Sequence, residues 1–93
     1  MYLIGIQVEI HLYATFSLKE KRRIIRSLVD HIRSRYKISA AEVAYMDNLD
    51  RGSVGFGIVS NNKQKAETIL QKVINYMDIQ SELEITHIEW LEA

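Results

Sequence analysis

The fold is decided by an alternating segment near the start of the chain, Ile4-Gly5-Ile6-Gln7-Val8-Glu9-Ile10-His11-Leu12. Every second residue of this segment is a branched aliphatic one, and polar or small residues stand between them. Successive side chains of a strand point to opposite faces, so the pattern predicts a strand with one face in the core.

Two helices are predicted downstream of this strand. Ser17 followed by Glu20 is a capping-box pattern and predicts a helix start. The apolar stripe of this helix consists of Leu18, Ile25, Leu28, Val29, Ile32 and Tyr36. Asn61 or Asn62 caps the second helix, whose stripe consists of Ala66, Ile69, Leu70, Val73, Ile74 and Met77. Both stripes have the spacing of amphipathic helices.

Three further strands complete the pattern, at about residues 38–46, 53–60 and 82–91. The order βαββαβ is that of the ferredoxin-like α+β sandwich. We expect an antiparallel sheet in the order 4-1-3-2, with both helices on one face and right-handed crossovers. The 93 residues are expected to form one domain, residues 1–93.

The composition narrows the chemistry. The chain has no Cys, which excludes disulfides and thiolate metal sites. No apolar run approaches the ~20 residues of a membrane span, and the start of the chain lacks a basic leader, so a cytoplasmic protein is expected. The three histidines have no metal-ligand spacing, and no nucleophile stands beside a base. We therefore expect no cofactor and no enzyme activity.

The net charge is zero, but the charges are unevenly distributed. Residues 19–37 contain eight Lys and Arg against two acids, whereas acids outnumber bases from residue 42 onward. This asymmetry indicates either a balanced surface or a basic patch for a polyanion. Overall neutrality argues against a strong non-specific nucleic-acid binder.

The first helix begins with four cations, Lys19, Lys21, Arg22 and Arg23. A helix N-terminus carries partial positive charge, so each cation there costs a few tenths to ~1 kcal/mol. This cost suggests that an anion binds at this end. The topology also brings the turn Asp47–Arg51 to the same end of the sheet.

Four basic residues lie within a sector of roughly 60° on one flank of the first helix, and they are Lys19, Arg22, Arg26 and Arg33. We name them the basic stripe. One interpretation is a phosphate-binding surface, and the other is a solvated helix edge whose aliphatic stems cover apolar surface.

Lys21 and Arg51 have two interpretations each. Lys21 lies on the apolar face of its helix and either pairs with Asp47 or Asp50 or holds a phosphate. Arg51 either closes a network with those two aspartates or joins Lys21 and Arg22 in an anion cradle.

The sheet face opposite the helices is not a base-stacking platform. RNA-recognition domains of this strand order display aromatic residues on their central strands. Here Phe56 has the core phase, and Gly55, Gly57 and Val59 have the open-face phase. Open-face glycines allow another backbone to approach, so a homodimer through this face or through the edge strand at residues 38–46 is expected.

The chain resembles the YlxP-like family (domain of unknown function 503) over almost its whole length. The resemblance rests on Ser17-Leu18-Lys19-Glu20-Lys21-Arg22, on Glu42 and on the turn beginning at Tyr45. The family pattern there reads roughly H-Q-D-L-W-Q-R. Asp47 and Arg51 match it, whereas the His and Trp are Tyr45 and Leu49 in this chain. The resemblance implies a ferredoxin-like fold, an unestablished function, and genes often placed beside translation and ribosome-maturation factors.

The leading hypothesis is a non-enzymatic protein that binds structured RNA or a ribosomal particle through this basic end. Lys19, Arg22 and Arg26 contact phosphates in this hypothesis, and Lys21 and Arg51 position the site. The alternative is a homodimeric protein-interaction or small-ligand-binding module. An enzyme is the weakest hypothesis, because the catalytic loop that acylphosphatases of this fold carry after their first strand is missing.

Overall fold

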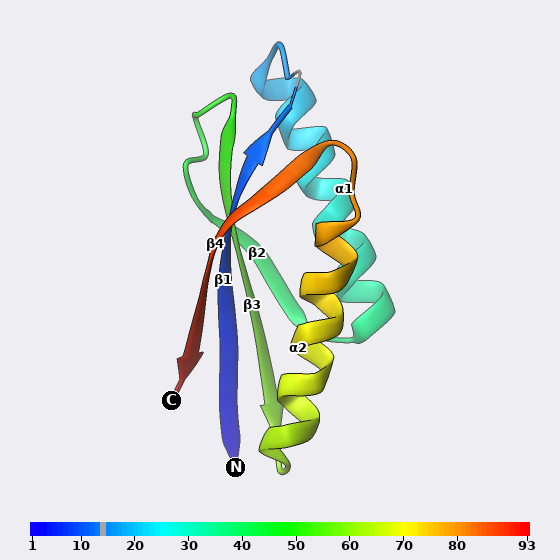
Figure 1. Cartoon of the computed structure of the whole chain (residues 1–93), viewed down its shortest axis with the longest axis vertical. Coiled ribbons are helices and arrows are strands. Elements are labelled where there is room, and N and C mark those ends of the chain that lie inside the picture. Colours follow the sequence, from blue (N-terminus) through cyan, green and yellow to red (C-terminus); the bar gives the residue numbers. More distant parts are fainter. Residues whose placement is uncertain (14) are drawn as a thin grey trace.

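The computed structural model describes residues 1–13 and 15–93. The elements follow one another as β1 Tyr2–Leu12, α1 Leu18–Tyr36, β2 Ser39–Ala44, β3 Arg51–Ser60, α2 Lys63–Asp78 and β4 Leu83–Glu92. This is the predicted βαββαβ order, and both helices cover the same face of the sheet (Figure 1).

The sheet has the strand order β2-β3-β1-β4, and every pairing is antiparallel. Ile6 on β1 pairs with Phe56 on β3 and with Trp90 on β4, so β1 is a central strand. The order is the predicted 4-1-3-2 read from the other edge. The fold is therefore a ferredoxin-like α+β sandwich, with one sheet face left open (Figure 1).

The core forms between the helices and the alternating side chains of β1. The five aliphatic side chains of β1 that face the helices, from Ile4 to Leu12, are at most 3% exposed, and those of the helices close over them. The predicted stripes need adjustment in both helices. Ile24 is also buried, whereas Leu18 and Tyr36, at the two ends of α1, are only partly buried, and so is Ile69 in α2.

Both helices begin where their caps were predicted. The Ser17 hydroxyl accepts the Glu20 N–H at 3.1 Å, and the side-chain oxygen of Asn62 accepts the Lys65 N–H at 3.0 Å. The Glu20 carboxylate accepts the N–H of Phe16, at a long 3.5 Å, where a capping box would bring it to Ser17. At its other end α1 stops at Lys37, which has the left-handed φ of 56°.

The strand β2 is shorter than predicted, and it ends at Ala44. Tyr45, which follows it, has a left-handed φ of 59° and cannot continue a strand. The register with β3 also shifts between Glu42 and Ala44. The chain therefore leaves the sheet after Ala44. Residues 45–50 form the β2–β3 turn, which lies beside the start of α1. In the described part of the chain, no helix combines the length and apolarity needed to cross a membrane.

Candidate functional site

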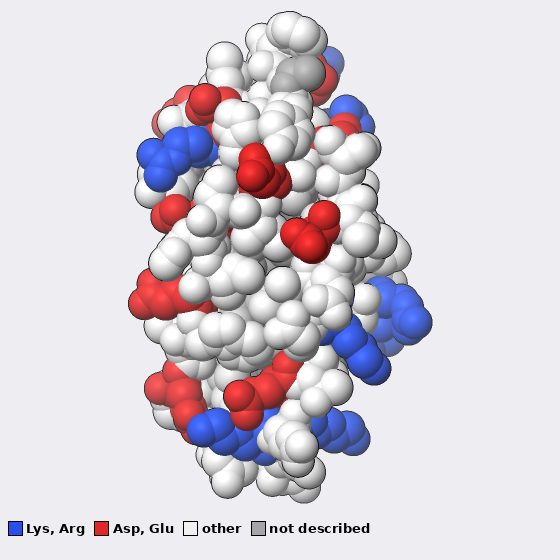
Figure 2. Space-filling view, in the orientation of Figure 1, with Lys and Arg blue, Asp and Glu red and all other residues white. Residues whose placement is uncertain are grey.

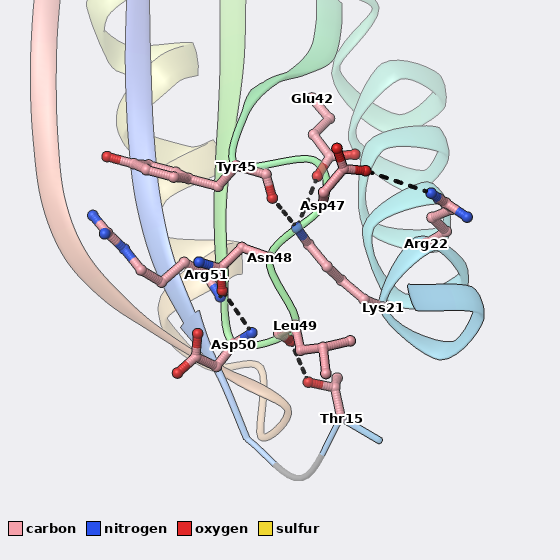
Figure 3. A network of polar contacts seen from close by, with 10 residues as sticks. All are labelled: Thr15, Lys21, Arg22, Glu42, Tyr45, Asp47, Asn48, Leu49, Asp50 and Arg51. Atoms are coloured by element: carbon pink, nitrogen blue, oxygen red, sulfur yellow. Dashed lines mark hydrogen bonds and ion pairs between the residues drawn. The ribbon is translucent and has the colours of Figure 1, made fainter. Parts of the chain in front are cut away.

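The start of α1 and the β2–β3 turn lie side by side, as the topology predicted (Figure 3). Thr15 donates its hydroxyl to the carbonyl of Leu49, and the Lys21 ammonium donates to the carbonyl of Tyr45. The Arg22 guanidinium lies 4.0 Å from the Asp47 carboxylate. The residues of the family pattern thus meet at one end of the molecule.

Lys21 is fully buried, although it is a lysine in the first turns of a helix. Its ammonium lies 3.4 Å from Oε2 of Glu42 and donates to the carbonyl of Tyr45. The predicted pairing with Asp47 or Asp50 is wrong, because the ammonium extends under the turn to β2 (Figure 3). A phosphate in solution has no access to a side chain with 0% exposure, so Lys21 ties α1 to β2 and contacts no external anion.

The β2–β3 turn is held by its own hydrogen bonds. The Asn48 side-chain oxygen accepts the N–H groups of Asp50 and Arg51, both at 3.1 Å. The N–H of Asn48 donates to the carbonyl of Tyr45 at 3.1 Å. The same carbonyl oxygen also accepts a hydrogen bond from the ammonium of Lys21. Asx-turns of this kind fix a loop without burying it. The turn therefore presents Asp47 in a fixed backbone frame, with its carboxylate 93% exposed.

Arg51 belongs to neither of its predicted networks. Its guanidinium lies over the ring of Tyr45, 4.1 Å from the centroid, and 4.0 Å from a Glu9 carboxylate oxygen. The Tyr45 hydroxyl donates to the other oxygen of Glu9 at 3.3 Å. Arg51 begins β3 with the open-face phase, so it points away from Lys21 and Arg22 (Figure 3). The role of Asp50 is also in the backbone, where its carbonyl accepts the N–H of Leu12 at 2.8 Å.

The basic stripe is exposed along the outer flank of α1. The four side chains of the stripe and that of the neighbouring Arg23 are all exposed to solvent. In the described chain, Lys19, Arg26 and Arg33 form no ion pair, and Arg22 has only its long contact with Asp47. Arg23 points to the other flank, where it lies 3.8 Å from Glu82 of the α2–β4 loop. In the view of Figure 2, most acids lie at the left and in the centre, and cations lie along the right side and the bottom, with a further cation among the acids at the upper left.

Two depressions flank the stripe. One, of about 750 Å³, is the open surface between the α1 side chains from Ser17 to Asp30, and Lys19, Arg22 and Arg26 line it. The other, of about 420 Å³, is a groove between α1 and β2. Its lining combines Arg22 and Arg26 with Asp30, Glu42, Met46 and the apolar residues Ile25 and Val29. Two guanidinium groups thus stand at the mouth of a partly apolar groove.

Exposed apolar side chains also occur at this end, and the sequence reasoning missed them. Phe16 is 83% exposed, Met46 50% and Leu49 42%. Phe16 directly precedes the cap of α1, and Met46 and Leu49 lie in the adjoining turn. The only sequence signal was an aromatic residue outside every predicted stripe. These side chains add an exposed apolar component to the end of the molecule that carries Lys19 and Arg22.

The titratable residues elsewhere are dispersed. His31 stacks on Tyr76, with 4.4 Å between ring centroids, and His11 contacts the edge of Tyr13 at 5.1 Å. His87 stands opposite Glu9 in the β1–β4 register. In residues 1–13 and 15–93, no three His, Cys, Asp or Glu side chains come together as a metal site would require.

A family model described as "Protein of unknown function (DUF503)" matches residues 4–90. The chain belongs to the DUF503 family. A relative named "Uncharacterized protein YlxP", from Bacillus subtilis (strain 168), is 33% identical over 86 residues, which cover 90% of this chain and 94% of that protein. The resemblance to the YlxP-like family is thus confirmed, and the family descriptions assign no function to the DUF503 fold.

Proposed function

We propose that this DUF503 protein binds structured RNA, free or within a ribosomal particle, through the basic stripe of α1. The observation that carries the proposal is that three of the four stripe cations are exposed and have no ion-pair partner among the described residues. A cation that only balances the charge of its own fold would be expected to face an acid. These cations face solvent.

The position of the stripe adds a second argument. Lys19 and Arg22 stand in the first turns of α1, where the helix dipole disfavours cations by a few tenths to ~1 kcal/mol each. Bound phosphate removes that cost, because the exposed N–H groups and the cations then act on the same anion. Arg33 follows Lys19 by fourteen positions, so at 1.5 Å per residue the stripe extends about 20 Å and reaches several phosphates.

Guanidinium groups bind phosphate through directed hydrogen bonds as well as through their charge. Arg22 and Arg26 are one helical turn apart, and each can donate two parallel hydrogen bonds to a phosphate. The groove beside them and the exposed ring of Phe16 provide apolar surface for an unpaired base. Asp30 lies within the stripe and, with Glu42 in the groove, limits binding to an RNA shape that avoids both carboxylates.

The test is co-sedimentation of the purified protein with ribosomal subunits of its host, at low and moderate salt. Arg22→Glu/Arg26→Glu is compared with Lys65→Glu/Lys72→Glu, which changes the net charge equally on the exposed surface of α2. We expect the wild type and the α2 variant to co-sediment at low salt and the stripe variant to remain in the supernatant.

Equal binding of all three proteins would refute the assignment of the surface. Absence of binding by the wild type at both salt concentrations would refute a ribosomal partner, and titration of a labelled structured RNA would then test the remaining RNA hypothesis.

A further inference from the structure

The open face of the sheet is mostly apolar at one end and charged at the other, and Glu89 of β4 stands between them, in the same row as Gly55. At the apolar end, Gly5 of β1 pairs with Gly57 of β3, and Gly55 pairs with Ala41 of β2. We name Gly5, Gly55 and Gly57 the glycine trough. The charged end, toward the β2–β3 turn, contains Glu9, His11, Arg51, Glu84 and His87.

Exposed aliphatic side chains border the trough. Val59 is 65% exposed, Leu91 48%, Val43 45% and Leu3 44%. Leu3 and Val59 stand opposite each other in the register, one step along the sheet from the pair Gly5 and Gly57. An apolar groove of about 360 Å³ lies on this face, lined by residues of all four strands. Leu3 and Val59 thus form a ridge directly beside the glycine trough on the same face of the sheet.

Gly57 has no reason within the chain to be glycine. A Cβ built on it would meet nothing within 4 Å, and its φ is not positive. Glycine in a strand interior is unfavourable, and it commonly marks a place where another backbone approaches. Gly5 is different, because a Cβ there would lie 2.8 Å from the carbonyl oxygen of Phe56. The absent side chain of Gly57 is therefore explained by a surface outside this chain.

We propose that the open face binds a second copy of this chain, sheet against sheet, across the glycine trough. A twofold axis that crosses the strands between the ridge and the trough sets Val59 and Leu3 of each copy against Gly57 and Gly5 of the other. The contact is isologous, because the same patch supplies ridge and trough. This arrangement places Glu9 and Glu84 of each copy outside the contact and Glu89, in the Gly55 row, at its rim, so these carboxylates do not face one another across the two sheets.

The extent of the surface limits the area that the association can bury. The contact spans four strands, spaced ~4.8 Å apart, and four rows of open-face residues around the trough. These dimensions give roughly 500 Å² of sheet surface per copy. Stable interfaces bury about 800 Å² per partner, so the dimer is expected to dissociate in the micromolar range. The charged flank and the absence of open-face Phe or Trp on β1 and β3 make this surface a poor one for RNA.

The test is sedimentation velocity from about 1 to 200 μM for the wild type, Gly57→Glu and Val59→Lys. Gly57→Glu adds a side chain that has open space in the monomer but fills the trough in the dimer. Ser34→Glu, on the exposed surface of α1, is the control with the same added charge. We expect the wild type and the control to form dimers, and both face variants to raise the dissociation constant at least tenfold without lowering the melting temperature at protein concentrations where the wild type is monomeric.

A wild type that remains monomeric over the whole range would overturn the proposal. A dimer that survives both substitutions would also overturn it, because the copies would then meet elsewhere, for example at the edge of β2. Equal weakening by Ser34→Glu would show that added charge alone opposes association and would have the same consequence. Val59→Lys decides the question if Gly57→Glu does not fold.

Discussion

At the residue scale, the junction between α1 and β2 depends on Lys21. Its position on the apolar face of a helix could be read from the sequence, since it shares that face with Ile25 and Leu28. Its partner could not, because Glu42 became visible as an inward residue only once the phase of β2 was set against β3. The short strand with alanines on both faces carries almost no alternation from which to read that phase.

Lys21→Met is expected to lower the free energy of unfolding by about 3 kcal/mol, since it leaves a largely buried carboxylate and the Tyr45 carbonyl without their common donor. The partial exposure of Glu42, 20%, keeps the loss at the lower end of the range for broken buried pairs. Urea denaturation measures the difference. Lys19→Met, on the exposed flank, is the matched control and should change stability by less than about 0.5 kcal/mol. Equal effects of the two substitutions would contradict the burial of Lys21.

Lys21→Met/Glu42→Gln should recover part of the loss, because it replaces the unpaired carboxylate with a neutral amide. A double variant as unstable as the sum of the two single variants would show that the two side chains do not interact.

Tyr13 provides a pH-dependent contact at the same end of the molecule. Its hydroxyl donates to the Glu84 carboxylate at 2.7 Å, and this hydrogen bond, aided by desolvation and by the negative charge of Glu84, raises the pKa of Tyr13 above 10.0. The folded pKa exceeds the unfolded one, so the contact stabilises the fold fully below pH 10 and is lost as the pH rises through the raised value. NMR titration of the ring carbons should show Tyr13 ionising at a higher pH than in Glu84→Gln. Identical titrations would exclude the contact in solution.

At the scale of elements, both helix starts were predictable from the cap residues, and the predicted stripe of α1 stops at Tyr36, where the helix ends, whereas the end of β2 was not predictable. Lys37 and Tyr45 both take left-handed backbone conformations, with φ of 56° and 59°. Glycine or asparagine would have signalled such positions. A lysine and a tyrosine carry no such signal, and this is why β2 was predicted two residues too long at its C-terminal end.

Lys37→Gly is expected to raise the free energy of unfolding by roughly 1 kcal/mol, because glycine adopts the left-handed conformation without the clash of a Cβ. The bond from the Lys37 N–H to the Arg33 carbonyl, 3.0 Å long, is unaffected by the change. The measurement is the urea midpoint at constant m value. Lys37→Ala keeps the Cβ and should give no such gain, so a gain shared by both variants would assign the effect to the lost charge.

At the scale of the whole molecule, the alternation of β1 and the two amphipathic stripes were enough to predict the sheet order and the meeting of α1 with the β2–β3 turn. The partners predicted for Arg51 were wrong. Arg51 begins β3 on the open face of the sheet, and this phase brings its side chain to Glu9 and Tyr45. Arg22 and Arg26 were placed correctly on an exposed flank, because helical periodicity fixes a face without reference to other elements.

The most direct test of the central claim is the salt dependence of the affinity for a structured ribosomal RNA. If the basic stripe neutralises about three phosphates, the logarithm of the association constant falls against the logarithm of salt with a slope of roughly −2 to −3. We expect Arg22→Glu/Arg26→Glu to lose most of this slope together with most of the affinity at low salt, while Lys65→Glu/Lys72→Glu keeps both. A slope that is unchanged in the stripe variant would refute binding through the basic stripe, because the phosphates would then be bound elsewhere on the molecule.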